Sequence, residues 1–110
     1  MDVEMTELAD RIRALLEGDL AIEERRMFGS RAFLVDGKIL VGARRGGSLL
    51  VRVEIEHGAG LLGRPGVTHA VMGARTMSAN WLDVAAEAVA DDERLIFWLD
   101  VAREDAAGRS

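Results

Sequence analysis

The dipeptide Asp36-Gly37 lies between two apolar runs and constrains the fold of this chain more than any other feature. A type I′ turn requires two central residues that tolerate a positive φ, and an Asp-Gly pair meets this requirement. Residues 31–35 and 38–44 are therefore predicted to form a β-hairpin. The chain is thus expected to contain an antiparallel sheet.

The hairpin is predicted to continue into neighbouring strands on both sides. A short strand over 25–28 is expected before it, and another over 49–53 after it. The second connection is the loop Arg45-Gly46-Gly47, in which a glycine can take the left-handed conformation. A three-residue loop would direct Leu49, Val51 and Val53 to one face and Arg52 to the other, whereas a two- or four-residue loop would reverse this. We prefer the three-residue loop, because the reversed assignment of faces would bury Arg52 under the helices.

The two-residue turn also assigns the hairpin side chains to faces. One face is expected to pack against helices and to hold only apolar residues, namely Ala32, Leu34, Ile39, Val41 and Ala43. The opposite face is apolar in its middle and cationic at its edges, and it would hold Arg31, Phe33, Val35, Lys38, Leu40 and Arg44. A surface of this kind is usually covered, so a second subunit is the predicted cover.

Helices are expected at both ends and in the middle of the chain, where apolar residues follow the i, i+3, i+4, i+7 spacing. The predicted elements outside the hairpin region are helices over 2–17, 54–63 and 91–108 and strands over 67–72 and 77–84. The order is α-β-β-β-β-α-β-β-α. This order predicts an α+β fold in two layers, a largely antiparallel sheet with helices on one face.

The length of 110 residues predicts one domain, residues 1–110, with a single core. No cysteine is present, so disulfides and cysteine-based zinc sites are excluded. The acidic N-terminus lacks a secretory signal, and no apolar run approaches the ~20 residues of a membrane helix. The expected location is therefore the cytoplasm, without membrane contact.

The charge is unevenly distributed. Residues 25–53 hold seven basic residues and one acidic residue, although the whole chain has a net charge of −5. The arginines of this strip are the candidate contacts for an anion or a nucleic acid, namely Arg25, Arg26, Arg31, Arg44, Arg45 and Arg52. The alternative is that they pair with acidic helices of the same fold and protect the sheet edge. We favour the alternative, because the chain is acidic overall.

No pattern of a catalytic, cofactor-binding or metal site is found. His57 and His69 are the only histidines, and a metal ion requires three or four convergent ligands. Neither Gly-x-Ser-x-Gly nor Ser-x-x-Lys occurs. The acidic run at 91–93 is typical of a helix N-terminus. We therefore predict no catalytic residue, no cofactor and no metal. Trp98 is assigned to the core.

A family resemblance rests on Arg26-Met27-Phe28-Gly29 followed by Ala32 to Lys38. This combination resembles the TfoX N-terminal domain family. Further matches follow in the right order, namely Leu49 to Val53, Leu62 with Arg64-Pro65-Gly66, Gly73 to Met77 with Trp81, and Trp98. Ser30 and Thr76 depart from the pattern of the family.

The resemblance implies a two-layer α+β fold similar to secretion-chaperone-like domains, which often form dimers. It implies no catalytic residues. Full-length competence regulators of this kind also contain a C-terminal helical domain, which this sequence lacks. A regulatory role that depends on that second domain is therefore not carried over.

Three hypotheses about function follow. The first is a non-enzymatic interaction domain that forms a homodimer and is a candidate regulator. Its predicted interface residues are Phe33, Val35, Leu40, Ile96, Phe97 and Val101. The second is a nucleic-acid-associated regulatory module of the competence type that uses the arginine strip. The third is a small-ligand-binding protein or enzyme with a pocket between sheet and helices. We favour the first.

Overall fold

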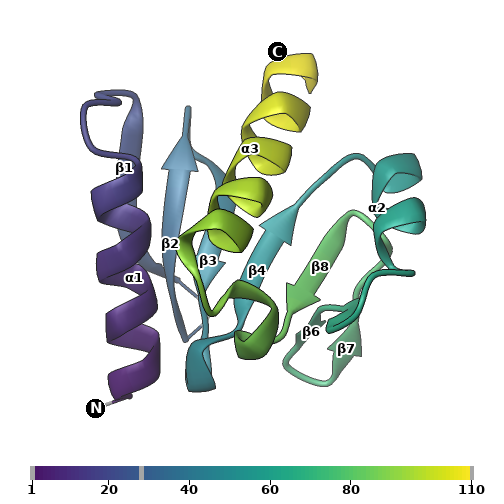
Figure 1. Cartoon of the computed structure of the whole chain (residues 1–110). Helices are drawn as coiled ribbons and strands as arrows, with labels where there is room; N and C mark the ends of the chain where they lie inside the picture. Colours follow the sequence, from purple (N-terminus) through teal and green to yellow (C-terminus); the bar gives the residue numbers. More distant parts are fainter. Residues whose placement is uncertain (1, 28, 110) are drawn as a thin grey trace.

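Six strands form one sheet, and two long helices lie across one of its faces (Figure 1). The computed structural model describes residues 2–27 and 29–109. The helices are α1 (Val3–Leu15), α2 (Ile55–Leu61) and α3 (Asp92–Arg109). The sheet comprises β1 (Ile22–Met27), β2 (Ser30–Val35), β3 (Lys38–Ala43), β4 (Leu49–Arg52), β5 (Val67–His69) and β8 (Trp81–Val84). The strand order across the sheet is β1-β2-β3-β4-β8-β5, and the paired strands are antiparallel.

The predicted α+β fold with its order of elements is confirmed. Some boundaries differ from the prediction. The predicted strand over 67–72 is divided at Ala70 into β5 and β6 (Val71–Met72), and β6 pairs with β7 (Arg75–Thr76) in a separate small hairpin. The first strand begins at Ile22, earlier than predicted. Phe28, its predicted last residue, lies outside the described residues.

The turn at Asp36-Gly37 forms as predicted. Both residues have positive φ values, 53° and 77°. The second predicted connection is also correct: residues 45–47 form a short 3-10 turn, η1 (Arg45–Gly47), in which φ is 76° at Gly46 and 86° at Gly47. As expected for a loop of this length, Leu49 and Val51 belong to the core, and the side chain of Arg52 lies on the other face.

The predicted faces of β2 are wrong, because β3 contains a β-bulge. Val35 pairs with Lys38 and Leu34 with Ile39, but Phe33 then pairs with Val41, so Leu40 is an extra residue in β3. An extra residue shifts the alternation of side chains by one position.

The bulge therefore places the side chains of β2 on the opposite faces of the sheet from those predicted. Phe33 and Leu40, which were expected on the open face, are only 2% and 3% exposed and lie in the main core. Val35 is partly buried against the same core. Ala32, Leu34 and Ile39, which were expected under the helices, form a separate cluster. Val41 and Ala43 face the helices as predicted, because they follow the bulge.

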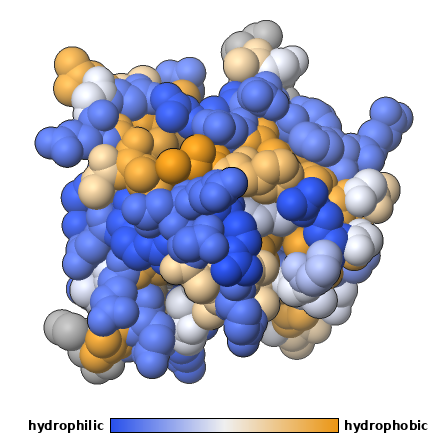
Figure 2. Space-filling view, viewed as in Figure 1, coloured by the Kyte–Doolittle hydropathy of each residue, from blue (hydrophilic) through white to orange (hydrophobic). Residues whose placement is uncertain are grey.

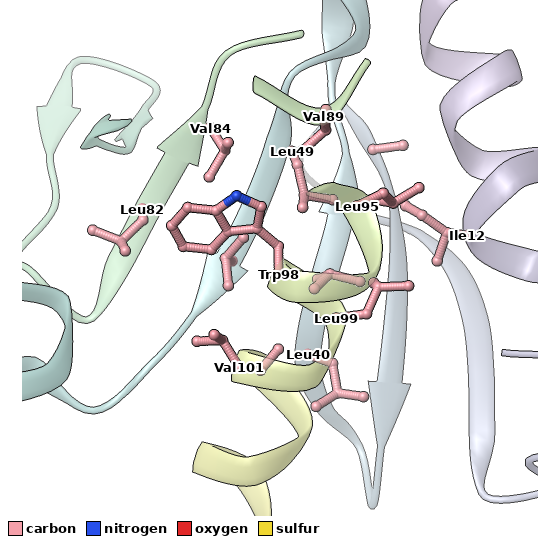
Figure 3. Close-up of a cluster of buried hydrophobic side chains, with 14 of the residues drawn as sticks. Ile12, Leu40, Leu49, Leu82, Val84, Val89, Leu95, Trp98, Leu99 and Val101 are labelled. Carbon is pink, nitrogen blue, oxygen red and sulfur yellow. The ribbon is translucent and has the colours of Figure 1, made fainter. Parts of the chain in front are cut away.

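The main core lies between the sheet and the helices. Leu95, Trp98 and Leu99 of α3 point toward the strands, and Leu49 and Leu82 approach them from the sheet (Figure 3). Ile12 of α1 lies beside this cluster and is fully buried. The apolar stripe predicted for the last helix is thus the one that covers the sheet.

The opposite face of the sheet is covered by side chains of the chain itself. Met27 and Trp81 pack against the small cluster of Ala32, Leu34 and Ile39. The guanidinium carbon of Arg52 lies 5.5 Å from the centre of the Trp81 ring. This face therefore does not need the second subunit that was inferred from the predicted register.

The helix α2 packs closely on the end of β8. A Cβ atom placed on Gly58 would lie 1.7 Å from the carbonyl oxygen of Ala79, so only glycine permits this approach. His57 of α2 contacts the carboxylate of Asp105 in α3, with 2.9 Å between Nδ1 and Oδ2. These contacts fix α2 beside α3 at one end of the molecule.

Candidate functional site

The arginine strip does not form one continuous surface. Its residues lie on alternating strand positions, so Arg25 shares a face with Ala32, and Arg26 shares the other face with Arg31. Arg26, Arg31 and Arg45 surround a hollow of about 760 Å³ at the N-terminal end of α1. Two carboxylates, those of Asp2 and Glu4, line the same hollow. The three cations therefore do not produce a purely positive surface.

Most of the six candidate arginines already have partners. Arg25 pairs with Glu23 at 2.8 Å, and Arg31 pairs with Glu24 at 3.0 Å. Arg44 lies 3.7 Å from Asp83 and donates a hydrogen bond of 2.8 Å to the carbonyl of Val71. Arg52 stacks on Trp81. Within residues 2–27 and 29–109, Arg26 and Arg45 are the two members of the strip whose side chains make no ion pair, hydrogen bond or ring contact.

The ionisable groups with shifted pKa values have structural contacts that explain the shifts. The pKa of Asp2 is lowered chiefly by the backbone N–H of Met5, then by that of Gly46. The pKa of Glu24 is lowered chiefly by a hydrogen bond from Arg13, whose own pKa is raised by the same contact. The pKa of Asp91 is lowered first by the backbone N–H of Arg94. These contacts are a cap of α1, an ion-pair cluster and a cap of α3.

The predicted interface residues of α3 have different surroundings. Val101 is 6% exposed and belongs to the core, whereas Ile96 is 41% and Phe97 36% exposed. With 3.6 residues per turn, Glu93 and Asp100 lie between Ile96 and Phe97 around the helix axis. The outward side of α3 is thus an acidic ridge with one apolar residue on each flank.

From the helix side, the surface is largely hydrophilic (Figure 2). Hydrophobic side chains form a band across the upper half of the view, over the region where α1 and the middle of α3 lie in Figure 1. Charged groups border this band closely. The helix side therefore has no broad uninterrupted apolar patch.

A cluster of aromatic and cationic side chains lies where the chain leaves α2 and meets α3. The guanidinium carbon of Arg64 is 4.3 Å from the ring centre of Phe97 and 5.9 Å from that of Trp98. The two rings meet edge to face at 5.1 Å and 87°. In the described part of the chain, the guanidinium of Arg64 has no carboxylate within ion-pair distance. We call Arg64, Phe97 and Trp98 the Arg64 corner.

The local sequence explains how Arg64 reaches α3. Pro65 and Gly66 end the α2 region, and Gly66 has a φ of 80°, which favours glycine. A Cβ on Gly66 would also lie 3.1 Å from the Cβ of Ala88. This close approach brings the turn against the 3-10 turn η2 (Ala86–Val89), which directly precedes α3.

A pocket of about 330 Å³ opens beside the Arg64 corner. It is lined by Arg64, Pro65, Gly66, Glu87, Ala88, Arg94 and Trp98. Arg94 is held in place by Asp91, with 2.8 Å between Nε and Oδ2, and by the Glu87 carbonyl, which accepts from Nη1 at 2.9 Å. We take this pocket and the Arg64 corner as the candidate functional site.

Sequence reasoning missed this site because its residues come from separate elements. Arg64-Pro65-Gly66 was interpreted as the end of a helix, and Trp98 as a core residue; both interpretations are consistent with the structure. Their proximity depends on how α2 packs against α3. In the described residues, no group of three His, Cys, Asp or Glu side chains is placed to hold a metal ion.

The fold and site define a small α+β domain in which helices cover one face of an antiparallel sheet. A family model described as the TfoX N-terminal domain matches residues 14–106. The chain belongs to the TfoX N-terminal domain family, which confirms the resemblance in the motif residues.

Comparison with solved structures supports the fold. A crystal structure of a protein from Pseudomonas syringae has a TM-score of 0.61 and 10% sequence identity, covering 84% of this chain and 93% of that chain. At this identity the likeness concerns the fold alone. No curated protein matches the chain. In the described ranges, no helix combines the length and apolar character required to cross a bilayer.

Proposed function

We propose that this domain acts by binding rather than by catalysis, and that it pairs with a second copy of itself through the Arg64 corner and the outward side of α3. The observation that carries the proposal is the arrangement around Phe97. Arg64 rests on this partly exposed ring without a carboxylate partner in the described chain. Clusters of arginine and aromatic residues are typical of the energetic centres of interfaces.

Charge complementarity favours a second copy as the partner. Glu93 and Asp100 project from the outward side of α3 next to Phe97, and in the described residues neither carboxylate has a partner. In a two-fold interface each surface meets its own copy. A two-fold axis near Phe97 would set Arg64 of one copy against Asp100 or Glu93 of the other. The same surface thus carries both halves of the ion pair.

A binding role also agrees with the family and with the ionisable groups. Membership of the TfoX N-terminal domain family supports a regulatory module of the competence type. The carboxylates with shifted pKa values belong to two helix caps and an ion-pair cluster, and structural contacts of this kind account for the shifts without a catalytic role. We therefore assign the domain a regulatory binding role.

The test is the mass of the protein in solution. Light scattering on a gel-filtration column, from low to high micromolar concentration, should give the mass of a dimer. Phe97→Asp should give the mass of a monomer, because it places a carboxylate in the interface. Leu20→Asp is the matched control, since Leu20 is 99% exposed in a loop, and it should leave the dimer intact.

A charge exchange makes the test specific. Arg64→Glu should weaken the dimer, and Arg64→Glu combined with Asp100→Arg should restore it. Circular dichroism on each variant establishes that the fold is retained. A wild-type protein that stays monomeric over the whole range would refute the homodimer.

A nucleic-acid role has weaker support. The observation in its favour is that Arg26 and Arg45 lie on the same hollow without ion-pair partners in the described chain. Asp2 and Glu4 on the same hollow oppose it, as does the net charge of −5. The remaining strip arginines are held by Glu23, Glu24, Asp83 and Trp81.

A further inference from the structure

The indole N–H of Trp98 is a hydrogen-bond donor for which the described chain provides no acceptor. The residue is 3% exposed, so almost all of its surface is covered by protein. In the part of the chain that the structure describes, Trp98 makes ring contacts but no side-chain hydrogen bond. A donor that is closed off from water and has no acceptor would cost about 1–3 kcal/mol. The role of this nitrogen therefore depends on whether it reaches solvent.

The nitrogen is not sealed inside the protein. Among the described residues, no side-chain nitrogen or oxygen that is closed off from solvent lacks a hydrogen-bond partner. The unpartnered indole nitrogen must therefore reach solvent, and Trp98 lines the pocket beside the Arg64 corner. In Figure 3 the nitrogen lies on the edge of the ring directed toward Val84, and Gly66 and Ala88 of the pocket adjoin this end of the sheet.

Two cations share the pocket with this donor. The guanidinium of Arg64 is positioned by Phe97 and retains all its N–H groups for other partners. Arg94 uses Nε for Asp91 and Nη1 for the carbonyl of Glu87, which leaves its Nη2 without a partner among the described residues. Three side chains with unpartnered donors therefore line one small pocket.

We propose that the pocket binds a carboxylate group. Its planar pair of oxygens can accept parallel N–H groups from a guanidinium, and the indole N–H supplies a further donor. The volume of about 330 Å³ is at the small end of ligand pockets, roughly 300–1,000 Å³. Pro65 and Ala88 offer apolar contact to the body of such an acid.

The charges around the pocket favour a monoanion over a dianion such as phosphate. Glu87 lines the pocket with a carboxylate of its own, and Asp91 neutralises part of the charge of Arg94. Phosphate carries more than one negative charge at neutral pH, so the carboxylate of Glu87 would repel it more strongly than a monoanion. A small free acid and an acidic side chain of a second copy share the same chemistry. The site itself does not depend on the proposed homodimer.

The test uses the two tryptophans as separate reporters. A ¹⁵N–¹H correlation spectrum of the labelled protein should contain two indole signals, and Trp81→Phe identifies the one that belongs to Trp98. Sodium acetate and sodium benzoate are titrated in turn, with sodium chloride at equal ionic strength and inorganic phosphate as comparisons. We expect a saturable downfield shift of the Trp98 signal with both acids, while the Trp81 signal stays in place.

Two substitutions test the assigned donors. Arg64→Gln and Arg94→Gln should each weaken acid binding about tenfold, as expected for a lost charge-assisted hydrogen bond. Arg75→Gln removes an exposed arginine from β7, outside the pocket, and should change nothing.

The outcomes separate the alternatives. A Trp98 signal that does not respond to either acid, or that responds equally to chloride, would overturn the proposal. Tighter binding of phosphate than of acetate and benzoate would overturn the assignment to a carboxylate. A Trp98 shift that follows protein concentration without added acid would identify a second copy as the source. Acid binding by a strictly monomeric protein would retain the site and reject the homodimer.

Discussion

Two glycines in α2 have opposite roles although they are only two positions apart. At Gly58 an added Cβ would overlap the carbonyl oxygen of Ala79, whereas at Gly60 nothing lies within 4 Å. Both lie in the interior of the helix, where glycine is about 0.5–1 kcal/mol less favourable than alanine. Gly58 is therefore required for the packing of α2, whereas the packing does not require Gly60.

We expect Gly60→Ala to stabilise the protein by up to about 1 kcal/mol. Gly58→Ala should destabilise it by roughly 1–3 kcal/mol or more, because α2 must move away from β8. Urea unfolding followed by circular dichroism measures both free energies. Equal effects of the two substitutions would contradict the close packing of Gly58.

The carboxylate of Asp2 links two elements at once. Its Oδ1 accepts from the backbone N–H of Met5 at 3.0 Å, which caps α1, and its Oδ2 accepts from Gly46 in η1 at 2.9 Å. These bonds lower the pKa of Asp2 below its ordinary value of 3.8. Its stabilising effect is therefore fully present above pH 3.8 and is lost as the pH falls through the lower folded-state value.

Asp2→Ala should consequently lower the melting temperature at pH 7. The difference from the wild type should shrink as the pH falls below 3.8, because the protonated wild-type residue also loses these contacts. Thermal melts across this pH range, with Asp2→Asn as the variant that keeps one acceptor, measure the effect. A difference that is independent of pH would contradict the ionic contribution.

At the level of elements, the β-bulge decides which residues of the hairpin are structural. Phe33 is 2% exposed and lies in the main core, on the side opposite to its prediction. Phe33→Ala should therefore cost about 3–5 kcal/mol of unfolding free energy. Leu20→Ala, at a fully exposed loop position, should change it by less than about 0.5 kcal/mol.

Chemical denaturation distinguishes the core position of Phe33 from the interface role that the sequence predicted. If Phe33 lay at a subunit interface, Phe33→Asp would give a folded monomer. In the core it should instead give an unfolded or aggregated protein. A folded Phe33→Asp monomer would contradict the observed register.

The hairpin shows how far local sequence can predict an element. Asp36-Gly37 determines its turn, because few residue pairs accept two positive φ values. The bulge at Leu40 has no comparable local signal, since Leu40 is an ordinary strand residue within an apolar run. Its position depends on which side chains best fill the space beneath the helices. The turn was therefore predictable, but the assignment of faces was not.

For the molecule as a whole, the arginine strip is predicted to bind nucleic acid weakly or not at all. We expect no band shift with duplex DNA or single-stranded RNA at physiological salt, because carboxylates hold three of its six arginines and Trp81 holds a fourth. Electrophoretic mobility measured at low and at physiological salt provides the check. Binding that falls steeply with salt and is abolished by Arg26→Glu with Arg45→Glu would reverse this conclusion.

The candidate site was less predictable than the fold. The helix periodicity and the turn residues act over a few positions, and they located most elements correctly. The pocket instead joins Arg64, Glu87 and Trp98, which are distant in sequence and belong to three elements. Which of the chain's arginines keep free N–H groups depends on the positions of carboxylates in the folded structure. That information is absent from local patterns.

The strand order has a consequence for folding during translation. β1, β2, β3 and β4 are adjacent in the sheet and consecutive in the chain, so their pairing requires only short loops. Their apolar face is covered in part by α1, which precedes them in the chain, and in part by α3, which follows all the strands. A nascent chain that ends before residue 92 can pair these strands but leaves the part of the apolar face under α3 exposed. Completion of α3 is therefore the step that closes the core and ends the exposure to aggregation.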